Sequence, residues 1–269
     1  MTRPARRIAR TAAAGAAVLL ALSACSSQGS SAPEASGSSP SSRKLSGTVT
    51  VFAAASLKES FTALGRQFER QHPGTRVTFS FGGSDTLAAS ITAGAPADVF
   101  AAASTRTMAL VTDREDAAGT PVTFVRNQLE IATLPGNPHK VSSLKDLTRS
   151  GLKVVLCDRT VPCGAAAREA LDTAGLTLTP ASYEQDVKSA LTKVELKEAD
   201  AAVVYRTDVK AAGDKVEGVE FPESATAVND YPIALLKDAP HTAAAKAFIE
   251  LVRSPRGLKV LSEAGFLAP

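Results

Sequence analysis

Three short stretches of the sequence bring small, hydrogen-bonding residues to the start of a predicted helix. They are "VFAAASLKES" around Ser56, "SFGGSDTL" around Ser84 and "VPCGAAAREAL" around Cys163. In each, an apolar run typical of a strand ends in small residues just before helix-forming residues begin. The first N–H groups of a helix have no partner inside the helix and lie at the positive end of its dipole. Three such ends that meet would bind an anion, and the serine hydroxyls would add further donors.

The two serines also fit an ordinary structural role as helix caps. Ser56 is followed three residues later by Glu59, which matches a capping box, so we expect Ser56 to be the N-cap of its helix. Ser84 follows Gly82 and Gly83, which permit close approach of the backbone, and we expect it to cap the next helix. Most N-cap serines only begin a helix, but three similar ends flanked by small residues favour a shared anion site.

A serine nucleophile is the alternative chemistry for Ser56, and it needs a base. The chain has three histidines: His72 at a predicted helix end, His139 in the loop "PGNPHK" and His241 at a predicted helix start. The GxSxG motif of serine hydrolases is absent, and so is a glycine-rich phosphate loop ending in Gly-Lys-Ser/Thr. These patterns disfavour a secreted serine hydrolase.

The elements that must position these residues alternate between strands and helices. The stretches 47–55, 75–84 and 97–104 are typical of strands, and the helix over 57–74 has apolar residues at Leu57, Phe61, Leu64 and Phe68. The alternation resumes in "NQLEIATLP", "GLKVVLCD" and "AAVVYR", and the last helix is expected to break at Ser254. This order predicts α/β lobes with mostly parallel sheets. Ligands of such sheets bind at the carboxyl ends of the strands, so we expect a cleft between two lobes.

The first 24 residues have the pattern of an export signal, with the basic "RPARRIAR" before the short apolar run "TAAAGAAVLLALSA". The run closes on "LSAC", which resembles a lipobox and predicts lipidation at Cys25. An ordinary secretory cleavage with an incidental cysteine is the alternative. The serine-rich stretch over 25–45 is typical of a flexible tether. The sequence therefore predicts an exported protein anchored to the outer face of the cell membrane.

The charge balance disfavours a nucleic-acid-binding surface. The formal net charge is +3, but four of the 30 Lys and Arg residues lie in the export signal, which has no acid. The other 26 Lys and Arg residues nearly balance the 27 Asp and Glu residues, so the rest of the chain is close to neutral. Tryptophan is absent and 5% of residues are aromatic, which also disfavours a base-stacking surface.

Outside the leader the chain has two cysteines, Cys157 and Cys163. In an exported protein an even pair fits a disulfide that fixes local geometry. Two free buried thiols are the alternative. A redox-active pair is disfavoured because the CxxC spacing is missing.

Five stretches together resemble the molybdate-binding proteins of bacterial ABC transporters: "VFAAASL", "GGSDTLAASITAGAPADVF", "VPCGAAAREAL", "EQDVKSAL" and "AAVVYRTDV". The resemblance spans residues 46–269 and implies a type II periplasmic-binding-protein fold with the ligand between two lobes. It implies a first lobe of 46–126 plus 231–269 and a second lobe of 127–230. It also implies these molybdate-binding residues: Ser56, Ser84, Cys163, Val187 and Tyr205.

From the resemblance we expect a monomeric binding protein, not an enzyme, without a cofactor and without a bare metal cation. It would bind molybdate or tungstate as an oxyanion and deliver it to the permease and ATPase of an importer. A receptor for another tetrahedral oxyanion such as sulfate is the alternative. The sequence departs from the family pattern at Asp85, next to Ser84, which we expect to point away from a dianion along the first helical turn.

Overall fold

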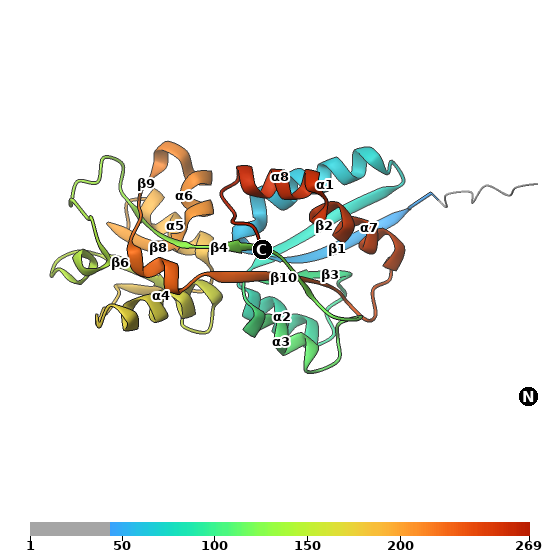
Figure 1. The fold of residues 1–269 in the computed structure, drawn as a ribbon, viewed down its shortest axis with the longest axis horizontal. Coiled ribbons are helices and arrows are strands. Elements are labelled where there is room, and N and C mark those ends of the chain that lie inside the picture. The colour runs from blue at the N-terminus through green and yellow to red at the C-terminus, as the bar shows by residue number, and fades with distance from the viewer. Residues whose placement is uncertain (1–43) are drawn as a thin grey trace, which may run out of the picture. The chain divides into compact units, whose positions relative to one another are not determined.

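The computed structural model describes residues 44–269 (Figure 1). The predicted export signal, the predicted lipidation site Cys25 and nearly all of the predicted tether lie outside the described residues. Within residues 44–269, none of the helices is long and apolar enough to cross a membrane.

The first of two sheets has five strands in the order β2-β1-β3-β10-β4. The strands are β1 (Gly47–Ala54), β2 (Thr75–Gly82), β3 (Val99–Ala101), β4 (Val122–Asn127) and β10 (Asn229–Leu235). The central strand β3 is buried along its whole length, as its apolar sequence "VFA" predicts.

Helices cover both faces of this first sheet, and together they form the first lobe (Figure 1). They are α1 (Lys58–Gln71), α7 (Thr242–Arg253) and α8 (Pro255–Glu263) on one face and α2 (Ser84–Thr92) and α3 (Thr105–Thr112) on the other. The predicted apolar face of α1 is confirmed, because Phe61, Leu64 and Phe68 have no exposed surface. Phe61 contacts the rings of Phe124 and Phe248, so this helix is fixed against both a strand and α7.

The second sheet also has five strands, in the order β7-β6-β8-β5-β9. The strands are β5 (Leu129–Thr133), β6 (Val154–Cys157), β7 (Ser182–Glu184), β8 (Ala201–Tyr205) and β9 (Glu217–Val219). In Figure 1 the helix α4 (Pro162–Thr173) lies on one side of this sheet and α5 (Val187–Glu195) and α6 (Arg206–Ala212) lie on the other. This second lobe has one continuous apolar core, onto which Ala55 of the first lobe also packs.

Four short 3-10 turns complete the described secondary structure: η1 (Ala55–Leu57), η2 (Leu144–Thr148), η3 (Gly213–Lys215) and η4 (Pro222–Thr226). The predicted break in the last helix is confirmed at Ser254, which ends α7 and caps α8 by accepting the Gly257 N–H at 3.1 Å.

The sheets are mixed, but each agrees with the expectation of a mostly parallel sheet, because four strands run in one direction and a single strand, β10 or β5, opposes them. In the first sheet β1 pairs with β2 and β3 in parallel, but β10 pairs with β3 and β4 antiparallel. In the second, β6 pairs with β7 and β8 in parallel, but β5 pairs with β8 and β9 antiparallel. The antiparallel strands occur where the chain passes between the sheets, because β4 is followed by β5 after Gln128 alone and β10 follows the second sheet. The predicted lobe boundaries fall within β4 and β10.

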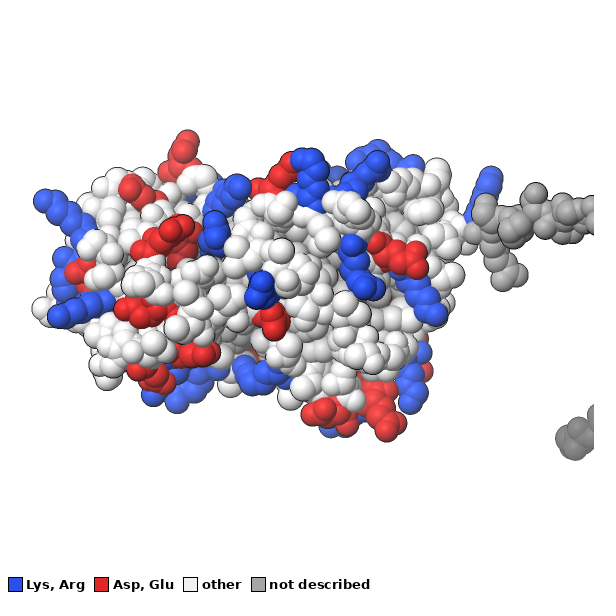
Figure 2. All heavy atoms as spheres, in the orientation of Figure 1, with Lys and Arg blue, Asp and Glu red and all other residues white. Residues whose placement is uncertain are grey.

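The predicted two-lobe α/β architecture is confirmed, and it brings five helix starts to the carboxyl ends of strands. A 3-10 turn and α1 follow β1, α2 follows β2, α4 follows β6, α5 follows β7 and α6 follows β8. Because these strands are parallel within each sheet, the helix starts of a lobe lie at one edge of its sheet. Figure 2 shows acidic and basic side chains interspersed on the face in view, without an extended basic stripe there.

Candidate anion-binding site

The five predicted site residues lie together in one buried cavity between the lobes, which we call the interlobe cavity. Its lining residues are Ala54, Ala55, Ser56, Gly82, Gly83, Ser84, Ala103, Val161, Pro162, Cys163, Asp186, Val187 and Tyr205. The two serines come from the first lobe, and the other three predicted residues come from the second. All five are at most 4% exposed, so the structure has its lobes closed over the cavity.

Ser56 lines the cavity, but it is not the N-cap that its sequence predicts. It lies in the 3-10 turn η1, and α1 begins at Lys58 with Leu57 as N-cap and without a side-chain cap. The predicted capping box does not form, because the Glu59 carboxylate instead pairs with Lys188 of the second lobe, with Nζ and Oε2 3.0 Å apart. The Ser56 Oγ instead lies 2.8 Å from the hydroxyl of Tyr231.

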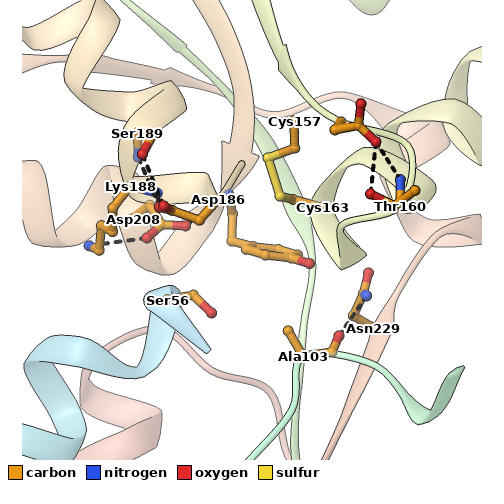
Figure 3. The surroundings of a disulfide bond; sticks show 12 residues. Ser56, Ala103, Cys157, Thr160, Cys163, Asp186, Lys188, Ser189, Asp208 and Asn229 are labelled. Atoms are coloured by element: carbon orange, nitrogen blue, oxygen red, sulfur yellow. Dashed lines mark hydrogen bonds and ion pairs between the residues drawn. A yellow bond between two sulfur atoms is a disulfide. The ribbon is translucent and has the colours of Figure 1, made fainter. Parts of the chain in front are cut away.

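Ser84 also differs from its predicted role as a cap. It is the first residue of α2, and Gly83 is the N-cap. Its Oγ accepts the backbone N–H of Ala103 at 3.0 Å, so the hydroxyl proton is free to be donated elsewhere. The carbonyl of Ala103 in turn accepts from the side-chain amide of Asn229 at 2.7 Å (Figure 3). The serine therefore enters the cavity with its oxygen already held in place.

Cys163 is the second residue of α4, so its N–H has no acceptor inside the helix, as predicted. Its sulfur is bonded to Cys157, which closes a loop of six positions in sequence (Figure 3). The loop packs tightly on the helix start, because a Cβ at Gly164 would overlap the carbonyl of Asp158. The disulfide and this glycine together hold the N-terminus of α4 against the cavity.

Val187 is the first residue of α5. The preceding residue, Asp186, also lines the cavity and was not predicted from the sequence. Asp186 is the N-cap: its Oδ1 accepts the N–H groups of Lys188 at 2.8 Å and Ser189 at 3.0 Å, and its Oδ2 accepts the Ser189 hydroxyl at 2.9 Å. Figure 3 shows this carboxylate beside Ser189. Asp186 is the one charged residue among those that line the cavity, and its oxygens are engaged in capping. The pattern Asp-x-x-Ser was the available sequence signal for this cap.

Tyr205 ends β8 and is 1% exposed. Its hydroxyl has no hydrogen-bond partner among the described residues. Burial, and secondarily the neighbouring Tyr231, raise the pKa of Tyr205 well above its usual value, so the phenol stays protonated and remains a donor. A buried hydroxyl without a partner is costly unless a ligand accepts its proton.

Polar contacts join the lobes on either side of the cavity. On one side Lys188 bonds to Glu59 of the first lobe and, at 3.1 Å, to the fully buried Asp208 beneath it. On the other side the guanidinium of Arg106 donates to the carbonyl of Thr160 at 2.7 Å. Thr160 belongs to the disulfide-closed loop, so that loop both supports the cavity and meets the first lobe. None of these partners was predicted from the sequence.

The prediction that Asp85 points away from the site agrees with its absence from the cavity lining. Its Oδ2 accepts a long hydrogen bond, 3.4 Å, from Thr160 of the second lobe. Its Oδ1 is buried without a hydrogen-bond partner among residues 44–269.

The interlobe cavity is small, and mostly small or apolar residues surround the three hydroxyls that line it. Its volume is about 10 Å³ for the centre of a water-sized sphere, far below the size of sites for drug-sized molecules. Within the described range, His, Cys, Asp and Glu side chains form no group of three that could hold a metal ion. A larger cavity of about 90 Å³ lies beside Arg168 and Tyr183 and contains none of the five predicted residues.

Similar proteins share this architecture over the whole described region. The family model for bacterial extracellular solute-binding proteins matches residues 49–267. The molybdate-binding protein ModA of Mycobacterium tuberculosis is 42% identical over 259 residues, which cover 96% of this chain and 97% of the relative.

Two solved structures show the same fold. The periplasmic molybdate-binding protein of Azotobacter vinelandii has a TM-score of 0.72 at 22% identity, covering 82% of this chain and 99% of that one. The sulfate-binding protein SubI of Mycobacterium tuberculosis has a TM-score of 0.69 at 19% identity, covering 81% and 86%. The chain belongs to the family of bacterial extracellular solute-binding proteins.

Proposed function

We propose that this protein is an extracytoplasmic receptor for molybdate, and for tungstate. The observation that carries the proposal is the interlobe cavity, which is lined by hydroxyls and helix N-termini from both lobes and, within the described part of the chain, by no cationic side chain. The ligands would be Ser56, Ser84, Cys163, Val187 and Tyr205, with the serines and the tyrosine giving hydroxyls and the helix starts giving N–H groups. Names of relatives such as ModA support the choice of anion.

The chemistry of the cavity suits an oxyanion that carries no proton. Molybdate at neutral pH is a tetrahedral dianion whose four oxygens only accept hydrogen bonds. Hydrogen phosphate carries a proton that needs an acceptor, and the one carboxylate beside the cavity, Asp186, is engaged in capping. A site of this kind rejects phosphate because polar groups would be left mismatched. Sulfate is also fully deprotonated, and its exclusion depends on size alone.

Capture would proceed by closure of the two lobes. The five proposed ligands are almost fully buried, so an anion reaches them only when the lobes separate. Motion at the crossings between the sheets, near Gln128 and before β10, would open the cavity. The first lobe would comprise 46–126 plus 231–269 and the second 127–230. The closed, loaded form would then dock on the permease of an ABC importer driven by its ATPase.

The proposal includes an exported, monomeric receptor that is lipid-anchored through Cys25. The sequence over 1–24 and the lipobox-like "LSAC" support export and lipidation. The serine-rich stretch that follows would let the receptor reach its transporter.

Titration calorimetry with molybdate, tungstate, sulfate and phosphate tests the function. We expect molybdate and tungstate to bind tightly, and Ser84→Ala to weaken both because it removes a donor and leaves the Ala103 N–H without its partner. A charge-assisted hydrogen bond contributes about 1.5–3 kcal/mol, so the loss would be about tenfold to a hundredfold. Ser90→Ala on the same helix is the matched control, since its hydroxyl bonds only to the Thr86 carbonyl. Sulfate binding as tight as molybdate binding would refute the specificity.

A further inference from the structure

The direction of one hydrogen bond decides whether Ser56 can serve an acceptor-only anion. Its Oγ lies 2.8 Å from the hydroxyl oxygen of Tyr231, and either group could be the donor. If Ser56 donated, its single proton would be spent inside the protein. If Tyr231 donates, the Ser56 proton is free to point into the interlobe cavity.

Asn127 limits what the Tyr231 oxygen can do. The Asn127 Oδ1 accepts the backbone N–H of Gln128 at 3.0 Å, which fixes the orientation of the side-chain amide. Its Nδ2 then lies 2.9 Å from the Thr207 Oγ1 and 3.3 Å from the Tyr231 hydroxyl. An amide nitrogen only donates, so the Tyr231 oxygen is an acceptor in this contact.

The Tyr231 proton needs a partner of its own, because this residue has no exposed surface. Burial raises the pKa of Tyr231 well above its usual value, so the phenol keeps its proton at neutral pH. The Tyr205 hydroxyl lies near that of Tyr231 but outside hydrogen-bond geometry. Ser56 is the oxygen at hydrogen-bond distance, 2.8 Å, that can accept the Tyr231 proton. With the opposite direction, the phenol proton would be left with the poorly placed Tyr205 oxygen alone, which costs free energy.

We propose that Tyr231, oriented by Asn127, is a positioning residue that donates to the Ser56 Oγ and thereby directs the Ser56 proton toward the bound anion. The inference rests on the proposed function. Ser84 is prepared in the same way, because its oxygen accepts the Ala103 N–H. Both serines would thus present their protons to the anion before it arrives, and neither would have to break an internal bond that it donates.

A double-mutant cycle on molybdate affinity tests the inference. Tyr231→Phe removes the donated hydrogen bond and keeps the ring, and we expect affinity to fall about two- to tenfold. If Tyr231 acts through Ser56, the same change in the Ser56→Ala background should have little further effect. Tyr183→Phe is the matched control, because this tyrosine is 48% exposed and lies beside the separate cavity. Thermal unfolding of the ligand-free variants establishes that each is folded at the titration temperature.

The outcomes separate this inference from the proposed function. Unchanged affinity of Tyr231→Phe, or effects of Tyr231→Phe and Ser56→Ala that add fully, would overturn the positioning role while molybdate binding by the wild type stands. Wild-type protein that binds none of the tested oxyanions would overturn the proposed function and this inference with it.

Discussion

A single methyl group added at Gly83 should act as a wedge between the lobes. Gly83 is the N-cap of α2 and lines the interlobe cavity, with φ −61° and ψ 131°, values that alanine adopts without strain. A Cβ built there lies 2.5 Å from the carbonyl oxygen of Gln185 in the second lobe and 2.8 Å from the Asp85 Oδ1. The nearer contact is with backbone of the opposite lobe, so that clash exists only while the lobes are closed. The contact with Asp85 lies within the first lobe, but it involves the end of a side chain, which can rotate away.

The size of the effect follows from the displacement that the methyl group requires. Relieving the contact between the Cβ and the Gln185 oxygen to 3.0–3.4 Å needs the lobes to separate there by about 0.5–0.9 Å. A hydrogen bond of about 2.9 Å stretched by that amount passes the range in which it is strong. Each charge-assisted bond that is lost costs about 1.5–3 kcal/mol, so Gly83→Ala should weaken molybdate binding about tenfold to a hundredfold per bond.

Calorimetry on Gly83→Ala, with thermal unfolding of the ligand-free protein, measures this. The melting temperature without ligand should be unchanged or slightly higher, because alanine reduces the entropy of the unfolded chain. Ser90→Ala on the same helix is the control, since Ser90 is not among the residues that line the cavity and its hydroxyl donates to the Thr86 carbonyl. Wild-type affinity of Gly83→Ala, or an equal loss in Ser90→Ala, would refute the wedge. A lower melting temperature of ligand-free Gly83→Ala would point to local strain instead.

Three further changes test the contacts around the cavity. Glu59→Gln removes the half-exposed partner of Lys188 and should weaken anion binding at most about fivefold, because exposed ion pairs contribute little free energy. Titrations at two ionic strengths should show a smaller loss at high salt. A loss of affinity greater than about fivefold would contradict this reasoning. Burial raises the pKa of Asp208 from 3.8 to about 6, so its contribution to stability is present below pH 3.8 and is lost as the pH rises through 6. Asp208→Asn does not lose stability in this way, so the difference in free energy of unfolding between the variant and the wild type should shift in favour of the variant by up to about 3 kcal/mol from pH 4 to pH 7. Denaturant titrations at the two pH values measure this difference. A difference that does not change with pH would refute the raised pKa of Asp208. Joint replacement of Cys157 and Cys163 by alanine should lower the free energy of unfolding by about 2 kcal/mol, because the disulfide closes a loop of six positions. The replacement should also weaken anion binding. Unchanged affinity in calorimetry would show that the start of α4 keeps its position without the disulfide.

The sequence predicted the elements well wherever local periodicity determines them. Residue types at short spacing predicted the apolar residues Phe61, Leu64 and Phe68 of the first helix and the break at Ser254. The resemblance predicted the grouping of the five site residues. The direction of the antiparallel strands was not predictable in this way, because a strand's direction depends on where the chain enters the sheet. β5 and β10 enter their sheets after crossing between the lobes.

The details of the two serines show where local patterns fail. Ser56 and Glu59 have the spacing of a capping box, but a 3-10 turn intervenes and Glu59 bonds across the cleft instead. The partner of Ser56 is Tyr231, 175 positions away in sequence. Local spacing carries no information about such a contact, and the stretch "YPIALLK" indicated only a strand. Tyr231 and Asn127 therefore emerge only from the folded structure.

The proposed ligands are divided between the lobes, with Ser56 and Ser84 on one side and Cys163, Val187 and Tyr205 on the other. Neither half surrounds a tetrahedral anion by itself, and no lysine or arginine among residues 44–269 lines the cavity to retain the anion after separation. A transporter that grips both lobes would therefore need only to pull them apart to discharge the cargo. Unloading would be a mechanical step that requires no proton transfer and no competing ion.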